Sequence, residues 1–198
     1  METIWRLDNF RNIGGGPPHI LGKPRLVQGD GGKYMEFDGE RDGLLINHHP
    51  LVGAEAFTIE VVFRPRAGGL TEQRFVHLQE DGGESRVLIE TRLTRGGDWF
   101  LDTYIQSEEA QQTLFAEGHL HPLGAWYQAA VAYDGQIMRH FVDGEQELEA
   151  EVVWQPLGPG QASLGVRLNR VCWFKGAMVL VRFVDKALGL GEFFEVVK

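Results

Sequence analysis

The chain has 198 residues, and its 28 acidic and 19 basic side chains give a formal net charge of −9. This acidic balance argues against nucleic acid as a partner, because binding through phosphates needs basic surface. A single cysteine excludes an internal disulfide framework, and 26 glycines, about 13% of the chain against a usual 7%, predict many tight turns.

The N-terminal part of the chain predicts one strand followed by an irregular excursion. Residues 3–7 have the alternation of a strand, whereas residues 9–32 contain the run GGGPP and show little alternation. We interpret 9–32 as a Gly/Pro-rich loop, either an ordinary surface loop or a lid over a site.

Asp-Gly pairs recur along the chain from residue 30 onward. Both residues tolerate the positive φ angles that two-residue hairpin turns demand, and the pairs begin at Asp30, Asp38, Asp42, Asp81, Asp134 and Asp143. Beside them, runs rich in β-branched and aromatic residues predict strands at 57–63, 74–80, 85–94, 99–106, 126–133, 137–142, 147–153, 162–168 and 174–184. Only residues 188–196 suggest a helical period, over a turn or two.

This pattern predicts an all-β chain. Short, regularly spaced strands in one unit favour a two-sheet antiparallel β-sandwich of the jelly-roll type. We find no linker or repeat, so residues 1–198 are expected to form a single domain.

No targeting segment is visible. Glu2, Arg6 and Asp8 interrupt the N-terminus, which leaves no apolar run of signal-peptide length. The longest apolar stretch, residues 177–181, is far shorter than the roughly 20 residues that cross a bilayer. We expect no membrane insertion and, for the chain as written, a cytoplasmic location.

Four groups of residues resemble the laminin-G-like domains of the concanavalin A-like lectin/glucanase superfamily. They are YMEFDG at 34–39 with FTIEVVFRP at 57–65, WYQAAVAYDG at 126–135, FVDG at 141–144, and FKG, VRF and KAL near the end, at 174–176, 181–183 and 186–188. The resemblance spans about residues 33–190. It implies a jelly roll of two curved antiparallel sheets, a buried Trp126 and a family that is often extracellular.

The resemblance also marks one departure. Family members often carry an Asp-Glu pair in the closing strand, where this chain has Val179 and Leu180. A metal or polar role for that pair is therefore not expected here. Burial of Val179 and Leu180 under another strand, a loop or a second subunit is expected instead.

No catalytic constellation is identified. The Glu-x-Asp-x-(x)-Glu strand of the glucanases is missing, and Cys172 lies in an apolar setting that raises the pKa of a thiol. Glu145, Glu147, Glu149 and Glu151 would share one face of a strand. We interpret that ladder as the solvated side of an edge strand, where charge discourages further pairing.

Metal sites are weakly indicated. The pairs His48 with His49 and His119 with His121 lack an identifiable third ligand and are expected to be loop histidines. The resemblance makes calcium the one candidate cofactor, through the loop acids Asp38, Asp42, Asp134 and Asp143, but turn geometry already explains all four.

Strand alternation predicts a carbohydrate-binding face. Val87, Ile89, Thr91 and Leu93 would face the core, as would Leu101 and Ile105. The side chains predicted to lie on the opposite, sugar-binding face are Arg86, Glu90, Arg92, Asp102, Tyr104 and Gln106, together with Gln128 on a later strand and Trp154 as a second stacking surface. The alternative is an ordinary solvated sheet face.

These observations favour a non-catalytic recognition module, lectin-like, whose partner is a carbohydrate or a protein. Two alternatives stay open. One is a polysaccharide-active hydrolase or lyase of the same fold. The other is a structural module in which Val179 and Leu180 pack in a homo-oligomer.

Overall fold

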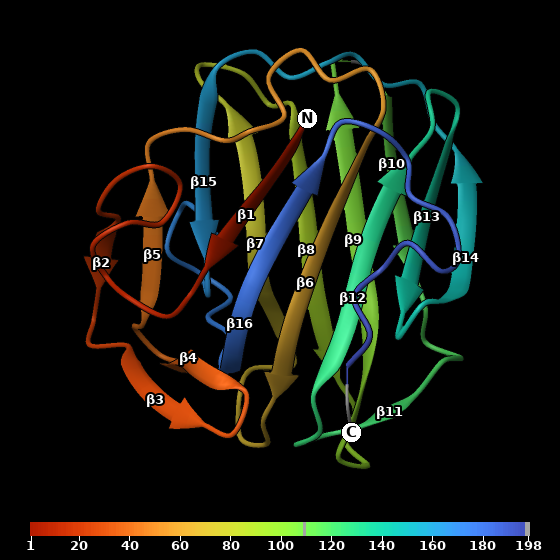
Figure 1. Cartoon of the computed structure of the whole chain (residues 1–198). Coiled ribbons are helices and arrows are strands. Elements are labelled where there is room, and N and C mark those ends of the chain that lie inside the picture. The colour runs from red at the N-terminus through yellow and green to blue at the C-terminus, as the bar shows by residue number, and fades with distance from the viewer. Residues whose placement is uncertain (109, 197–198) are drawn as a thin grey trace.

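Two antiparallel sheets stack face to face in the computed structural model, which describes residues 1–108 and 110–196 (Figure 1). No helix occurs among these residues, so none that could cross a membrane is found there. The predicted all-β sandwich is confirmed.

Sheet 1 lies nearer the viewer in Figure 1 and has eight strands. In spatial order they are β14 (Glu145–Glu151), β13 (Ile137–Val142), β12 (Tyr127–Tyr133), β6 (Phe57–Pro65), β16 (Lys175–Val184), β4 (Gly32–Asp38) and β3 (Arg25–Gly29). The eighth strand, β1 (Glu2–Arg6), pairs with the second half of β16, beyond the point where β4 ends.

Sheet 2 lies behind it and also has eight strands. Their order is β10 (Ala110–Phe115), β9 (Asp98–Ser107), β8 (Arg86–Leu93), β7 (Glu72–Glu80), β15 (Gly160–Leu164), β5 (Gly43–Ile46) and β2 (His19–Leu21). The short strand β11 (His121–Pro122) pairs with the start of β9.

The core forms between the inner faces of the two sheets. At its centre, Phe63 of β6 stacks on Phe75 of β7 at 4.6 Å between ring centroids, and the ring of Trp99 meets Phe63 edge-on at 5.2 Å. All three side chains are fully buried. Since successive side chains of a strand point to opposite sides, this packing leaves each sheet one outer face.

The Asp-Gly turns behave as two kinds of connection. Four of the six pairs join antiparallel neighbours, at β3–β4, β7–β8, β12–β13 and β13–β14. In the last of these, Asp143 and Gly144 have φ angles of 50° and 79°, as a type I′ hairpin requires. The pairs at Asp38 and Asp42 instead lie where the chain passes from sheet 1 to sheet 2.

Three sequence predictions need correction. Residues 9–32 are only partly irregular, because β2 and β3 fall within them and extend one edge of each sheet. Residues 188–196 form no helix but an irregular segment across the outer face of sheet 1. The strands β5 and β10 were not predicted, since each is short and lacks a run of β-branched residues.

Gly165 is required by both backbone conformation and space. Its φ is +78°, and a Cβ there would lie 2.4 Å from the Phe37 ring. Gly15 has a φ of +88° but open space around it. We expect Gly15→Ala to lower the free energy of unfolding by about 1 kcal/mol, through backbone strain alone, and Gly165→Ala to lower it by about 2 to 4 kcal/mol, because overpacking adds to that strain. Urea unfolding followed by tryptophan fluorescence measures both, and equal losses would contradict the packing argument.

Candidate functional site

Six of the eight predicted carbohydrate-binding residues lie together on the outer face of sheet 2. The strands β8 and β9 pair with Glu90 opposite Asp102 and Arg86 opposite Gln106. We call this surface the polar face. It consists of these six residues together with Glu72 and Arg74 from β7 and Gln111 and Phe115 from β10. The six are Arg86, Glu90, Arg92, Asp102, Tyr104 and Gln106.

Ion pairs organise the centre of the polar face. Arg92 contacts Asp102 at 2.7 Å and Glu72 at 2.6 Å, while Arg74 contacts Glu90 at 2.8 Å and also pairs with Glu72. Glu90 and Asp102 are each only 2% exposed, so their charges depend on these arginines. The network therefore fixes two guanidinium groups at the surface.

Burial shifts the proton equilibria of the two central carboxyl groups. It raises the pKa of Glu90 to about 7 even though Arg74 opposes the shift, and it raises the pKa of Asp102 against the opposing effect of Arg92. The pKa of Glu72 is lowered, because Arg74 and Arg92 together outweigh its burial. The pKa of Glu90 thus lies near neutral pH.

The rim of the polar face combines aromatic rings with planar polar groups. The guanidinium of Arg86 lies over Tyr104 at 5.2 Å from the ring centroid, and that of Arg92 lies over Phe115 at 5.6 Å. The Tyr104 hydroxyl lies 2.8 Å from the side-chain oxygen of Gln106 and 2.6 Å from that of Gln111. Because a hydroxyl donates one proton, it can donate to only one of these amides.

Gln128 and Trp154 do not belong to the polar face. Gln128 lies on β12 of sheet 1, is fully buried, and accepts a hydrogen bond from the backbone N–H of Gly144 at 3.0 Å. Trp154 is buried against Phe57, and its indole N–H donates to the Ala54 carbonyl at 3.1 Å. Alternation indicates which side of a strand a residue faces but not which sheet the strand joins, and this is why Gln128 was misplaced.

The loop after β15 covers one side of the polar face. In it, the half-buried Cys172 adopts a φ of 56°, and its Sγ lies 2.6 Å from a guanidinium nitrogen of Arg74. Burial raises the pKa of this thiol, as expected from the sequence. The backbone N–H of Leu168 in the same loop donates to Nδ1 of the buried His77 at 3.1 Å.

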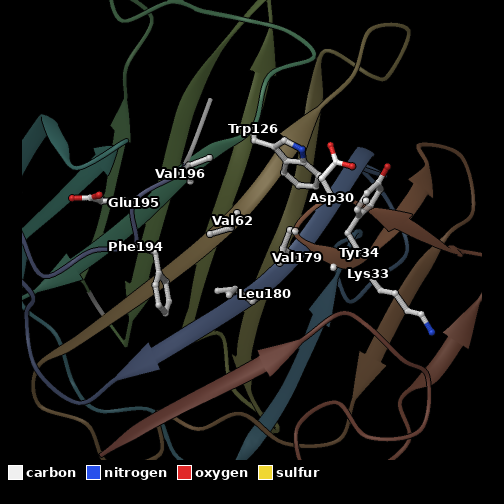
Figure 2. Close-up of a pocket in the computed structure, with 13 residues that line it drawn as sticks. Asp30, Lys33, Tyr34, Val62, Trp126, Val179, Leu180, Phe194, Glu195 and Val196 are labelled. Atoms are coloured by element: carbon white, nitrogen blue, oxygen red, sulfur yellow. The ribbon is translucent and has the colours of Figure 1, made fainter.

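A hollow of about 590 Å³ lies on the outer face of sheet 1 (Figure 2). Its floor consists of Val62, Val179 and Leu180, and Tyr34 and Trp126 form one wall. Trp126 is half-exposed here rather than buried in the core, which corrects the expectation from the resemblance. Phe194 lies on the opposite side.

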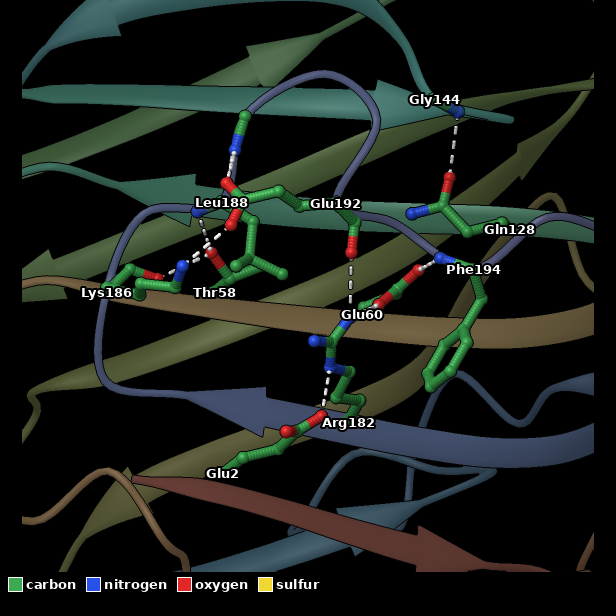
Figure 3. Close-up of polar contacts among 11 residues, drawn as sticks. Glu2, Thr58, Glu60, Gln128, Gly144, Arg182, Lys186, Leu188, Glu192 and Phe194 are labelled. Carbon is green, nitrogen blue, oxygen red and sulfur yellow. Dashed lines mark hydrogen bonds and ion pairs between the residues drawn. The ribbon is translucent and has the colours of Figure 1, made fainter.

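The chain's own C-terminal segment borders this hollow and is fastened to sheet 1 (Figure 3). The buried carboxylate of Glu60 accepts from the backbone N–H of Phe194 at 2.6 Å and from Arg182 at 3.1 Å. Arg182 also donates to the Glu192 carbonyl at 3.0 Å. Burial raises the pKa of Glu60 above its usual value. Leu180, which was expected to be buried, is 7% exposed and lies in the floor of the hollow that residues 194–196 border.

The predicted ladder of glutamates is broken by a β-bulge. The register of β13 with β14 shifts between His140 and Phe141, so that Glu147 is the extra residue. Its carboxylate is 5% exposed and lies 2.6 Å from Nε2 of His121 and 3.5 Å from Nε2 of His140. The other three glutamates of the ladder stay exposed.

No arrangement among the described residues brings three or more His, Cys, Asp or Glu side chains into position to hold a metal ion. The predicted calcium ligands Asp38 and Asp134 accept hydrogen bonds within their own turns. Asp38 accepts the backbone N–H groups of Glu40, Arg41 and Asp42, and Asp134 accepts those of Gln136 and Ile137. Calcium at these turns stays a prediction without a ligand set.

Comparisons with known proteins extend this description. A family model described as "Concanavalin A-like lectin/glucanases superfamily" matches residues 38–192, whereas no curated protein matches the sequence.

Three similar solved structures share the fold. One is domain 4 of AbnA, a GH43 extracellular arabinanase from Geobacillus stearothermophilus, in complex with arabinotriose. That domain is 18% identical to this chain, with a TM-score of 0.71, and the match covers 96% of this chain and 94% of that chain. The heptameric SAP-like pentraxin of Limulus polyphemus is 13% identical over 78% of this chain and 76% of its own, with a TM-score of 0.64. The CBM40 of the Ruminococcus gnavus IT-sialidase, bound to α2,3-sialyllactose, is 12% identical over 87% and 95%, with a TM-score of 0.60.

His77 makes the stability of the fold depend on pH. Burial, together with Arg167, Arg86 and Arg74, lowers its pKa from 6.5 to about 3. Between these values the unfolded chain binds a proton that the folded chain does not, so the free energy of unfolding falls as the pH falls. From pH 7 to pH 5 this group should remove about 2 kcal/mol.

The variant His77→Asn keeps an acceptor for Leu168 but does not titrate, so its loss of stability between pH 7 and pH 5 should be about 2 kcal/mol smaller than that of the wild type. Urea unfolding at the two pH values measures this. His119→Asn, at an exposed position, is the control and should behave as the wild type. An unchanged pH dependence in His77→Asn would show that the argument is wrong.

Proposed function

Because this chain belongs to the concanavalin A-like lectin/glucanases superfamily, we propose that it is a non-catalytic recognition module that binds carbohydrate on the polar face. A sugar presents hydroxyl groups around a ring whose faces are partly apolar. A complementary surface therefore needs planar hydrogen-bonding groups beside aromatic rings.

One observation carries this proposal: the guanidinium groups of Arg86 and Arg92 are each held over an aromatic ring, beside the amides of Gln106 and Gln111. Ion pairs to the buried carboxylate of Asp102 and to the partly exposed one of Glu72 hold Arg92 in place, so its donors are ordered before a ligand arrives. Such preorganisation lowers the entropic cost of binding.

The similar structures support a saccharide ligand without identifying it. The arabinanase domain is in complex with arabinotriose, and the CBM40 is bound to α2,3-sialyllactose. At 18% and 12% identity, however, these proteins share only the fold with this chain.

An enzymatic role is the second candidate, and Glu90 is the observation that favours it. A carboxyl group with a pKa of about 7 could act as a general acid, and Asp102 lies directly opposite it. Both groups are engaged by arginines and almost fully buried. Glu90 and Asp102 therefore present little surface to a substrate, which makes binding without turnover the preferred function.

The test of the proposed function is a glycan array on the purified protein, followed by calorimetry with the saccharide that binds best. Tyr104→Phe removes one hydroxyl and Gln111→Ala one amide, so each should weaken binding about five- to tenfold. Gln136→Ala, at an exposed hairpin turn on the other sheet, is the matched control and should bind as the wild type.

A reducing-sugar assay separates the two candidate functions. Binding without product release supports a recognition module. Turnover by the wild type that is lost in Glu90→Gln would instead show that the protein is an enzyme. If the array shows no saccharide bound, or if neither variant weakens binding, the polar face is not the carbohydrate site.

A further inference from the structure

The outer face of sheet 1 carries an imbalance of charge around Glu36. Its carboxylate lies 2.7 Å from Arg25, 2.5 Å from Arg66 and 3.8 Å from Arg64. Within the described residues, none of these arginines has another carboxylate within 4 Å. Three guanidinium groups therefore share one carboxylate, in a protein whose net charge is −9.

Neighbouring acids do not pair with these three arginines. Asp30 and Glu195 line the hollow of Figure 2, but among the described residues neither forms an ion pair with Arg25, Arg64 or Arg66. Asp38 and Asp42 lie with Arg25 around a hollow separate from that of Figure 2. The carboxylate of Asp38, however, forms an ion pair with Arg41 and accepts hydrogen bonds from backbone N–H groups of its own turn. Asp42 accepts from the backbone N–H groups of Lys23 and Asp38. The excess positive charge stays at Arg25, Arg64 and Arg66.

The arginines are arranged so that two of them can reach a ligand. The side chain of Arg25 is 74% exposed and that of Arg66 is 42% exposed, whereas that of Glu36 is 9% exposed. An incoming anion would thus meet the guanidinium groups before the carboxylate beneath them. Charge-assisted bonds from arginine to planar oxyanions are among the strongest hydrogen bonds in proteins.

Arg64 links this charged group to the hollow of Figure 2. Its guanidinium carbon lies 4.7 Å from the Trp126 ring centroid and 5.3 Å from that of Tyr34, and it donates to the Tyr34 hydroxyl at 3.1 Å. Its buried Nε has no hydrogen-bond partner among the described residues. Both rings also line the hollow, above the aliphatic floor of Val62 and Leu180.

We propose that this strip of sheet 1, from the hollow to Arg25 and Arg66, is a second binding site and that its ligand is an acidic saccharide. The aromatic wall and aliphatic floor suit the apolar face of a sugar ring, and the excess of arginine suits an acidic substituent on that sugar or the next one. A neutral saccharide would leave the charge imbalance uncompensated.

This site is independent of the polar face. The strip lies on the outer face of sheet 1 and the polar face on that of sheet 2, so the two are on opposite sides of the sandwich. Variants of one should leave the other unaffected, and either proposal can fail alone.

Titration calorimetry with trigalacturonate, and with the same trisaccharide methyl-esterified at every carboxyl group, tests the proposal. We expect the acid to bind and the neutral ester to bind at least tenfold more weakly. Chondroitin tetrasaccharides with and without sulfate form a second arm, which shows whether sulfate strengthens binding beyond a carboxylate.

The double variant Arg25→Gln, Arg66→Gln should weaken binding of trigalacturonate about tenfold or more. Arg11→Gln, Arg95→Gln changes the net charge equally, at exposed positions where neither arginine forms an ion pair with a described residue, and should bind as the wild type, as should Tyr104→Phe. In the wild type, the acid should also shift the indole N–H resonance of Trp126, a measurement that needs no variant.

Three results would overturn the proposal. The first is equal binding of the acid and its ester, and the second is equal weakening in the two double variants. The third is the absence of binding by every acidic saccharide at millimolar concentration.

Discussion

Alternation of side chains along paired strands is the constraint on which this molecule depends. Each residue directed into the space between the sheets leaves its neighbours on an outer face, and the aromatic centre formed by Phe63, Phe75 and Trp99 fixes which residues those are. A strand displaced by one residue would exchange its two faces. The chemistry of both outer surfaces is therefore set by the packing of the interior.

The sequence predicted what depends on local pattern. Hairpin turns and alternation placed Arg92 and Tyr104 on one face, because both effects act over a few residues. Contacts made across long separations could not be predicted. The place of Gln128 on sheet 1 follows from the pairing of β12 with β6, where Gln128 lies opposite Val62. The position of Trp154 follows from packing on Phe57, and that of Trp126 from its contact with Arg64. The bulge that redirects Glu147 has no signal in the pattern of β14.

The two outer faces differ in how their acidic and basic side chains are balanced. On sheet 2, the arginines and acids of the polar face are nearly balanced, so the network is neutral enough to be buried while it orders the groups at its rim. On sheet 1, Glu36 meets an excess of arginine that stays in contact with water. This difference in charge balance is the reason why we propose a different class of saccharide for each face.

The bulge in β14 affects both the interior of the molecule and the exposed edge of sheet 1. Glutamates at 145, 149 and 151 keep foreign strands from pairing with this edge, while the extra residue, Glu147, turns inward to the two imidazoles. Removing Glu147 from this strand would restore the regular register and leave the Nε2 atoms of both rings without the carboxylate beside them. The length of the strand at this point therefore determines contacts inside the molecule as well as the charge along its exposed edge.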